Sequence, residues 1–354
     1  MRIQQDAYVK AFGELTHLGK GHRLRPLAHE VLRRFGVEAA LLRQFHETIN
    51  IVFRVTAGDG KRYVLRITPP WHFHGVEDVR SEIAWMRAIG DGAEIKLPTP
   101  LLTMDGEYVI TATWPKIPGE WQCVLFSWIP GKLLAKRWTH EKIEHYGRLS
   151  AMLHAQGRLF APTEQLRIRT YSSVFPHCNP SFRNPEPLVL LGGIDENLVP
   201  RAREDLLRRV HDRVQAEIDR LFNAAAPQPI HNDLHPWNVI VSRAHLCPID
   251  FENWLMGFPI QDLGATLHYI QHHFSERIPF DTSLACFRRG YEDVQRWPEQ
   301  RPGQIETMMA AHRLLLCNFY AASSDPEYRE FAVGFLERME HRLRSYLDCV
   351  CRAG

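Results

Sequence analysis

The chain has 354 residues, of which 45% are hydrophobic and 24% are charged. This length suits two domains and excludes a mini-protein that needs disulfides or metals to fold, while the composition excludes wholesale disorder and a fibrous architecture. Lysine and arginine number 43 against 41 aspartates and glutamates, so the net charge is only +2. With no long basic run, the chain is not expected to bind nucleic acid.

Targeting signals and cysteines indicate where the protein works. Residues 1–15 lack the apolar stretch of a secretory signal, and nowhere do about 18 apolar residues run together. The seven cysteines form no CxxC pair, which is typical of reduced thiols. We therefore expect a cytoplasmic protein without a membrane partner, and the sequence does not indicate its oligomeric state.

The first elements in chain order are a helix and three strands. Residues 24–35 have apolar positions at helical spacing and are followed by Gly36, which predicts a helix that ends there. Residues 41–68 are rich in β-forming residues and contain Gly58-Asp59-Gly60, a strong hairpin signal. Three antiparallel strands are the expected structure of this segment.

One helix then interrupts the strands. Residues 76–90 carry an apolar stripe at helical spacing that stops at Gly90. Residues 100–113 are predicted to form a hairpin about Asp105-Gly106, and residues 121–127 form a last strand before a Pro-Gly break. The first third of the chain is therefore expected to be mostly strand.

The rest of the chain has long helical patterns, over residues 141–156, residues 204–224 and several stretches from about 261 to the end. This change predicts a domain boundary near residues 127–131. Residues 162–200 are rich in Pro, Asn and Ser and are expected to form an irregular insertion that could shape a pocket or a lid.

The most specific segment is PIHNDLHPWNVIVSRAHLCPIDFENW, residues 229–254. Two short apolar strands are predicted in it, at 239–241 and 246–249. The first follows His231-Asn232-Asp233, and Asp250 comes directly after the second. Asn238 lies five residues after Asp233 and twelve before Asp250.

This spacing supplies the side chains that phosphoryl transfer needs. One carboxylate, Asp233, can orient and deprotonate a hydroxyl, and two hard oxygen ligands, Asn238 and Asp250, can hold Mg²⁺ against phosphates. The alternative is that these residues only cap turns, where Asn and Asp are common. That alternative is reasonable for any one of them but not for the whole set.

The segments HNDLHPWN and IDFE resemble the catalytic loop and the metal-binding motif of the aminoglycoside phosphotransferase and choline kinase family, which is related to the protein kinases. The resemblance implies that Asp233 is the catalytic base, that Asn238 and Asp250 bind Mg²⁺, and that His231 supports the loop. Asp262 matches a family aspartate that is usually structural.

The resemblance also implies an α+β, two-lobed, protein-kinase-like fold. Residues 1–127 would form a nucleotide-binding lobe with an antiparallel sheet and one helix. Residues 128–354 would form a larger, mainly helical lobe that contains the catalytic loop, the metal site and the acceptor pocket.

A kinase also needs a cation on the third strand to meet the phosphates of ATP, and a helix carboxylate to hold that cation. Arg66 and Glu82 stand at these places, although protein kinases have Lys for Arg66. Because a guanidinium is a planar fork, its phosphate contact must differ from that of a lysine. The alternative is a surface strand arginine paired with a helix glutamate.

Two further segments are candidate nucleotide contacts. Thr48 and Asn50 lie in the loop that covers the phosphates in kinases, but the loop has no glycine, and an ordinary hairpin loop is the alternative. By resemblance, Phe126, Ser127 and Trp128 lie at the hinge that holds adenine. The two aromatic residues could equally belong to an interdomain core.

The expected activity is ATP- and Mg²⁺-dependent transfer of the γ-phosphoryl group to a hydroxyl of a small molecule. The alternatives are a Ser/Thr protein kinase of the same superfamily and a nucleotide-binding pseudokinase, although a pseudokinase usually lacks the base or the metal ligands. Because Asp250 is followed within about a dozen residues by an apparent helix, there is no room for a conventional activation loop.

The sequence does not identify the acceptor. A polycationic acceptor would need a carboxylate-rich pocket. The candidate carboxylates are Glu252, Glu276, Asp281, Glu292 and Asp293. Other candidates for an acceptor site are Trp254, Trp297, His268, His272 and Tyr269. Each of these is equally consistent with a core or surface role, and His268 with His272 lacks the third ligand of a metal site.

Overall fold

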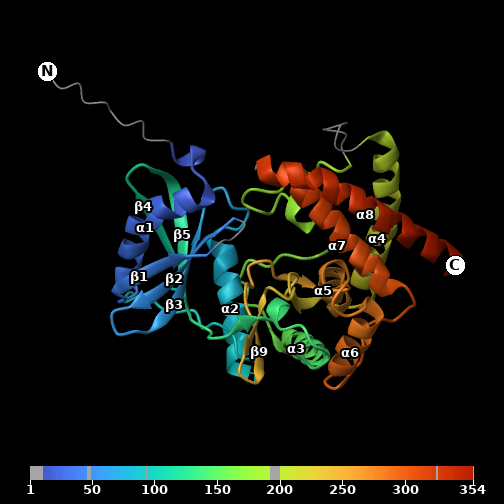
Figure 1. Ribbon diagram of the computed structural model, residues 1–354, viewed down its shortest axis with the longest axis horizontal. Helices are drawn as coiled ribbons and strands as arrows, with labels where there is room; N and C mark the ends of the chain where they lie inside the picture. Colours follow the sequence, from blue (N-terminus) through green and yellow to red (C-terminus); the bar gives the residue numbers. More distant parts are fainter. Residues whose placement is uncertain (1–10, 46–48, 93, 192–199, 324–325, 354) are drawn as a thin grey trace. The chain divides into compact units, whose positions relative to one another are not determined.

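The computed structural model describes residues 11–45, 49–92, 94–191, 200–323 and 326–353. The chain forms two compact units, of which the first comprises residues up to 72 together with 98–128, and the second comprises 73–97 together with 129–354 (Figure 1). The first unit is built on an antiparallel sheet and the second is mainly helical. The predicted α+β fold class is confirmed.

The first unit contains a five-stranded antiparallel sheet in the order β1-β2-β3-β5-β4. Its strands are β1 (Ala39–Gln44), β2 (Ile51–Ala57), β3 (Arg62–Thr68), β4 (Ile110–Trp114) and β5 (Ile117–Ser127). In β2, fully buried residues alternate with half-buried ones, because successive side chains of a strand point to opposite faces. The three strands expected between residues 41 and 68 are confirmed.

Helix α1 (His17–Arg34) packs on this sheet and begins earlier than the predicted residue 24. Its start is fixed by Thr16, whose side-chain oxygen accepts a hydrogen bond from the N–H of Gly19 at 3.2 Å. The short 3₁₀ helix η1 (Phe12–Glu14) precedes it and adds a buried phenylalanine to the same core.

The hairpin predicted about Asp105-Gly106 is wrong. Asp105 and Gly106 do form a tight turn, in which the N–H of Gly106 donates to the carbonyl of Thr103, but no strand precedes the turn. The hairpin lies between β4 and β5 instead, where Trp114 pairs with Ile117. β5 pairs with β4 on one edge and with β3 on the other, and both partners precede it in the chain.

The second unit contains the helices α2 (Val76–Gly92), α3 (His140–Leu159), α4 (Arg201–Ala224), α5 (Pro259–His273), α6 (Phe280–Glu292), α7 (Gln304–Ala322) and α8 (Pro326–Ala353). Helix α2 lies between strands of the sheet in sequence but groups with this unit. The indole of Trp85 explains why, since its ring centroid lies 5.3 Å from that of Phe251 and 5.5 Å from that of Trp254.

Short strands complete the second unit: β6 (Lys132–Leu133), β7 (Gln228–Ile230), β8 (Val239–Ser242), β9 (His245–Pro248) and β10 (Leu255–Gly257). A single turn of 3₁₀ helix, η2 (Leu134–Lys136), follows β6. Residues 160–191 are irregular, as predicted, apart from the 3₁₀ helix η3 (Pro176–Cys178) and one isolated bridge.

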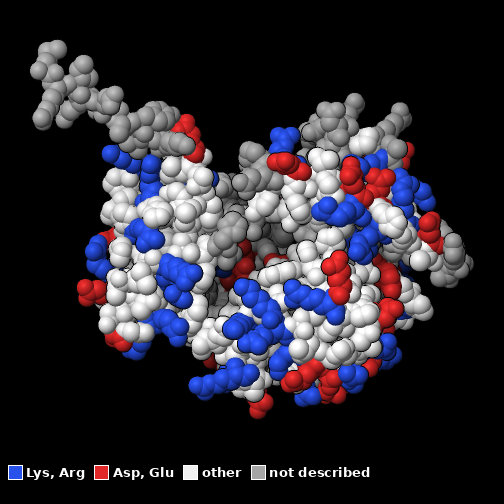
Figure 2. Space-filling view, in the orientation of Figure 1, with Lys and Arg blue, Asp and Glu red and all other residues white. Residues whose placement is uncertain are grey.

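On the face shown in Figure 2, lysine and arginine side chains lie among aspartate and glutamate side chains over the helical unit. Among the described helices, none is both long and apolar enough to span a membrane.

Candidate active site

The segment that carries the catalytic motif lies between β7 and β9 of the second unit. Strands β8 and β9 pair antiparallel, with Val239 opposite Pro248. This register brings Asn238, before β8, and Asp250, after β9, to the same end of the hairpin. The N–H of Ile249 donates to the carbonyl of Asn238 at 2.9 Å, which ties the two segments together.

Asp233 lies beside this hairpin end. The side-chain amide of Asn238 donates to the carbonyl oxygen of Asp233 at 3.0 Å and to its Oδ2 at 3.3 Å. The amide of Asn253 donates to the same Oδ2 at 3.4 Å. The other carboxylate oxygen, Oδ1, lies 3.8 Å from Nε2 of His235. Two amides therefore orient the carboxylate through Oδ2.

The surroundings of Asp233 suit a general base. The side chain is 20% exposed. Burial raises the pKa of Asp233 to about 6, although the nearby His231 and the amide hydrogen bonds favour the ionised form. Burial lowers the pKa of His235 to about 4, so this imidazole is neutral at pH 7. A carboxylate with a pKa near 6 is ionised at neutral pH and still accepts a proton readily.

His231 and Asp262 hold the loop in place. Nε2 of His231 lies 3.1 Å from the carbonyl of Ile249, directly before Asp250. The carboxylate of Asp262 accepts hydrogen bonds from the backbone N–H groups of His231, at 3.2 Å, and Asn232, at 2.7 Å. It also lies 2.9 Å from Nε2 of His154. Burial raises the pKa of Asp262, but the hydrogen bond and charge of His154 outweigh it, so the pKa stays below its usual value.

The donor set at this hairpin end fits Mg²⁺. The amide nitrogen of Asn238 is engaged with Asp233, which directs the amide oxygen of Asn238 away from that carboxylate. Asp250 has a left-handed backbone with a φ of 63°, which turns the chain immediately after β9. An amide oxygen and a carboxylate at one place are hard ligands of the kind Mg²⁺ prefers, with waters and phosphates completing the shell.

Three neighbours of Asp233 were not singled out from the sequence. His235 lies inside the motif HNDLHPWN, and Asn253 directly follows IDFE, so their positions in the motifs could have suggested them. His74 carries no such signal. Its Nε2 lies 3.5 Å from Oδ1 of Asn253, and its Nδ1 lies 3.0 Å from Nη1 of Arg169. Only the fold brings this histidine next to the motif.

The arginine behind His74 is itself held by a buried carboxylate. Nη2 of Arg169 lies 2.5 Å from Oδ2 of Asp78, and both side chains are less than 10% exposed. The guanidinium also lies over the ring of Phe182, 3.7 Å from its centroid. The irregular segment 160–191 is thereby fastened to the start of α2.

The first unit holds the other predicted nucleotide contacts. Arg66 on β3 is 6% exposed, and its guanidinium lies 5.4 Å from the ring centroid of Phe126 on β5. Ser127 exchanges two hydrogen bonds with Thr99, each 2.8 Å long. The ring of Trp128 stacks on Phe45 at 6.0 Å. The sheet thus brings Arg66 and Phe126 together on adjacent strands.

Asn50 is buried directly before β2, and Thr48 lies outside the described residues. Glu82 is buried on α2 of the second unit, whereas Arg66 belongs to the first. The Arg66–Glu82 pair therefore stays a prediction.

Of the acceptor candidates, Tyr269 lies near His235. Its ring centroid lies 4.7 Å from that of His235, which borders Asp233. Trp254 and Trp297 are buried in aromatic clusters of the core.

Three further acceptor candidates, His268, Glu292 and Asp293, have other contacts. His268 is buried against His312, and no group of three metal-binding side chains is found within the described ranges. Glu292 and Asp293 form surface ion pairs with Arg288 and Arg148. These carboxylates do not build a polycation pocket.

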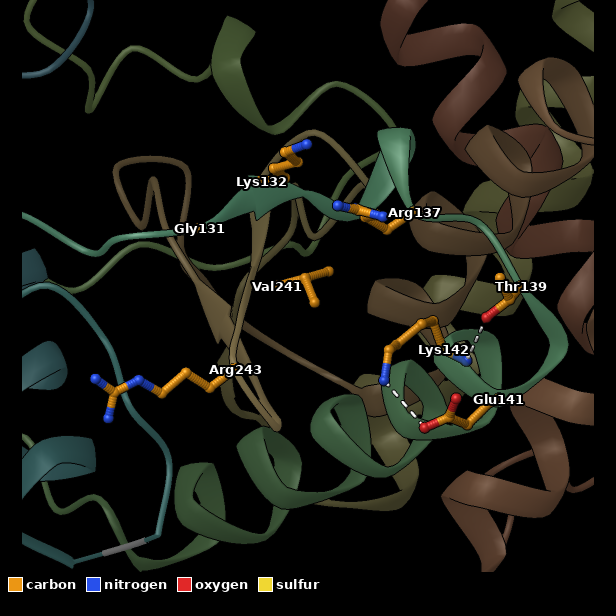
Figure 3. A pocket seen from close by; sticks show the side chains of 8 residues that line it. All are labelled: Gly131, Lys132, Arg137, Thr139, Glu141, Lys142, Val241 and Arg243. Atoms are coloured by element: carbon orange, nitrogen blue, oxygen red, sulfur yellow. Dashed lines mark hydrogen bonds and ion pairs between the residues drawn. The ribbon is translucent and has the colours of Figure 1, made fainter.

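A separate cavity of about 550 Å³ lies between β6, the start of α3 and the β8–β9 hairpin (Figure 3). Lys132, Arg137 and Arg243 contribute cations, while Lys142 is paired with Glu141 at 3.0 Å. None of the predicted site residues lines this cavity, so it is not the candidate active site.

Solved structures with the same fold include kinases of small molecules. A microcompartment-associated aminopropanol kinase is 19% identical, with 92% of this chain and 98% of that chain covered and a TM-score of 0.75. An amicoumacin kinase in complex with AMP-PNP, Ca²⁺ and Ami is 14% identical, with 92% of this chain and 96% of that chain covered and a TM-score of 0.70. Spectinomycin phosphotransferase in complex with ADP and spectinomycin is 13% identical, with 91% and 98% covered and a TM-score of 0.56.

The search of curated proteins found no match to this chain. The sequence profile of the phosphotransferase enzyme family matches residues 41–299, which include the sheet, the catalytic loop and the metal motif. This match covers most of the chain and confirms the predicted class of enzyme. The chain belongs to the phosphotransferase enzyme family.

Proposed function

We propose that the protein transfers the γ-phosphoryl group of Mg·ATP to a hydroxyl group of a small molecule, with Asp233 as the general base. The observation that carries this proposal is the carboxylate of Asp233, fixed by two amides through Oδ2 and placed beside the Asn238–Asp250 pair. Oδ1 has no hydrogen bond from these amides. We therefore assign Oδ1 as the oxygen that accepts the proton of the acceptor hydroxyl.

In the proposed reaction, Oδ1 of Asp233 takes the proton from the acceptor hydroxyl. The hydroxyl oxygen forms a bond to the γ-phosphorus while the bond from that phosphorus to the β–γ bridging oxygen breaks, and ADP leaves. Because the transition state is loose, positioning and charge stabilisation supply most of the rate enhancement. Asn238 and Asp250 would hold Mg²⁺, and the bound ion would supply positive charge to neutralise the phosphate oxygens.

On the nucleotide side, Arg66 is assigned to the phosphates and Glu82 to the support of that arginine. Phe126, Ser127 and Trp128 are assigned to the adenine, and Thr48 and Asn50 to the loop over the phosphates. Residues 1–127 and 128–354 would act as the nucleotide lobe and the catalytic lobe. The nucleotide complexes among the related structures support this assignment of ATP as the donor.

On the acceptor side, we assign His235, which borders Asp233, and Tyr269, whose ring centroid lies 4.7 Å from that of His235. We also assign Trp237, whose ring centroid lies 6.3 Å from that of Tyr269. Aminopropanol, amicoumacin and spectinomycin are named for the related structures, and all are small molecules. This supports a small-molecule acceptor.

The test is a thermal-shift titration with Mg·ATP on the wild type and on Asp250→Ala, with the exposed Asp348→Ala as a matched control. A ligand at one hundred times its Kd stabilises a protein by about 2.7 kcal/mol. The wild type and the control should be stabilised, and Asp250→Ala should not. An unchanged nucleotide response in Asp250→Ala would contradict the metal assignment. ADP release with a panel of small alcohols then identifies the acceptor.

A further inference from the structure

Two arginines of the second unit converge on one neutral oxygen. Helix α7 packs against both α5 and α8 (Figure 1). Nη2 of Arg313, on α7, donates to Oε1 of Gln271, on α5, at 2.7 Å. Nη1 of Arg342, on α8, donates to the same oxygen at 2.8 Å. One uncharged amide oxygen thus accepts from two guanidinium groups.

No carboxylate compensates these charges within the part of the chain that the structure describes. Glu340, the acidic residue two positions before Arg342, pairs with Arg203 at 2.9 Å and with Arg344 at 2.7 Å. Burial and the charge of Arg342 lower the pKa of Arg313 to about 10, and Glu306, two turns earlier on α7, opposes this shift only in part. Arg313 is nevertheless only 5% exposed.

The imidazoles around the two arginines are also without hydrogen-bond partners. His268 and His312 are 1% and 3% exposed, and neither ring nitrogen of either residue has a protein partner. Nδ1 of His272 and Nε of Arg313 are also buried without a hydrogen-bond partner. The ring centroid of His268 lies 5.4 Å from that of His312 and 5.7 Å from that of His272, so the three imidazoles form one cluster.

This arrangement is costly for the protein alone. A buried charge without a counter-charge destabilises a fold by several kcal/mol, and buried polar atoms are nearly always hydrogen-bonded. All the charged groups that converge here are cations, and the imidazoles add N–H donors. From these contacts we propose that the cluster of Gln271, Arg313, Arg342 and the three histidines binds an oxyanion, a phosphate or carboxylate group.

The cluster has an open side. Arg342, Gln271 and His272 are half-buried, and Arg338 and His273 are exposed beside them. Arg338 lies 5.7 Å from the ring centroid of Phe331. Burial, and after it the charges of His273, Arg342, Arg338 and Arg313, lower the pKa of His272 to about 4, so Arg338 is a further cation that faces the same place. An anion can therefore reach the two guanidinium groups from the surface of α5 and α8.

The test measures the melting temperature of the whole protein against increasing inorganic phosphate and, separately, acetate, with sodium chloride added to keep the ionic strength constant. We expect a saturable rise of about 2–4 °C with at least one of the two anions. A larger response to phosphate than to acetate would show that the cluster prefers a phosphate group. A larger response to acetate would show that it prefers a carboxylate. No saturable response to either anion would overturn the proposal.

Two variants locate the response. Arg342→Leu removes one guanidinium, and Gln271→Glu places a carboxylate between the two arginines. In each, the apparent affinity for the anion should fall at least ten-fold, and Gln271→Glu should melt at a higher temperature than the wild type without added anion. Arg344→Leu, on the same helix, should keep the response. A smaller loss of affinity in either variant would place the anion elsewhere, including at a nucleotide phosphate site, and refute the proposal.

Discussion

Oδ1 of Asp262 accepts a hydrogen bond from the backbone N–H of Asn232 at 2.7 Å. Asn232 has a left-handed backbone, with a φ of 62°, a conformation that costs free energy for any residue but glycine. A carboxylate from helix α5 thus holds the residue before the base in a strained conformation. The position of Asp233 is fixed by a residue 29 positions further along the chain.

Replacing Asp262 should therefore cost stability. In Asp262→Asn, the amide nitrogen would face a donor in place of one carboxylate oxygen, and the buried His154 would lose its carboxylate partner at 2.9 Å. We expect the free energy of unfolding to fall by about 2–4 kcal/mol at pH 7, measured by urea denaturation. Asp348→Asn, an exposed change on α8, should have almost no effect. Equal stability of the two variants would contradict the role given to Asp262.

Replacing Asp233 should separate activity from stability. Asp233→Asn keeps the shape of the side chain but removes the base, so turnover should fall by about 10²–10⁴-fold while the affinity for Mg·ATP changes little. Steady-state kinetics and a nucleotide titration measure the two effects. Equal loss of both would indicate that Asp233 is structural.

The same variant should be more stable than the wild type at high pH. The folded-state pKa of Asp233, about 6, lies above the ordinary aspartate value of 3.8, so ionisation favours the unfolded state as the pH rises. The loss of folding free energy caused by ionisation of Asp233 is fully present above pH 6 and absent below about pH 4. The free energy of unfolding of Asp233→Asn should therefore exceed that of the wild type by about 1–3 kcal/mol at pH 8, and this difference should be smaller at pH 5. A gain that does not depend on pH would need another cause.

The rate should follow the ionisation of the base. Because Asp233 must be deprotonated to accept the hydroxyl proton, kcat/KM should rise with pH and level off above about pH 6 to 7. The limiting slope of log kcat/KM against pH should be one on the acid side. The neutral His235 beside Oδ1 should not add a second ionisation above pH 5. A pH-independent rate between pH 5 and 8 would contradict the assignment of the base.

Asn238 should govern the requirement for Mg²⁺. In Asn238→Ala, one proposed metal ligand and both hydrogen bonds from the Asn238 amide to Asp233 are lost, so half-maximal activity should need at least about ten-fold more Mg²⁺. The measurement is activity against free Mg²⁺ at saturating ATP. Asn179→Ala, in a surface loop far along the chain from the motif, is the matched control and should keep the wild-type requirement.

Two glycines should be essential for the packing of α3 against α6. A Cβ on Gly147 would lie 1.8 Å from the carbonyl oxygen of Phe287, and a Cβ on Gly290 would lie 1.8 Å from that of Glu144. Backbone cannot move aside as a flexible side chain does, so Gly147→Ala should destabilise the protein by about 3 kcal/mol or more. Gly58→Ala, where a Cβ meets nothing within 4 Å, should be nearly neutral. Thermal unfolding compares them.

The sequence by itself determined the local elements and the chemistry of the motif. The β-rich run with Gly58-Asp59-Gly60 predicted the β2–β3 hairpin, and the apolar stripe through Leu207, Val210 and Val214 predicted α4, because both depend on residues close together in the chain. The same holds for the spacing of Asp233, Asn238 and Asp250, since one loop and one hairpin carry all three.

Tertiary structure alone decided which distant residues meet. Hydrogen bonds between strands placed β5 between β3 and β4, an order that the alternation of residues does not encode, and so displaced the hairpin expected at Gly106. Packing of Trp85 grouped α2 with the helical unit. His74 and Asp262 reach this region from segments that have no local pattern in common with the catalytic loop. Their roles depend on contacts across the fold, and such contacts leave no periodic signal in the sequence.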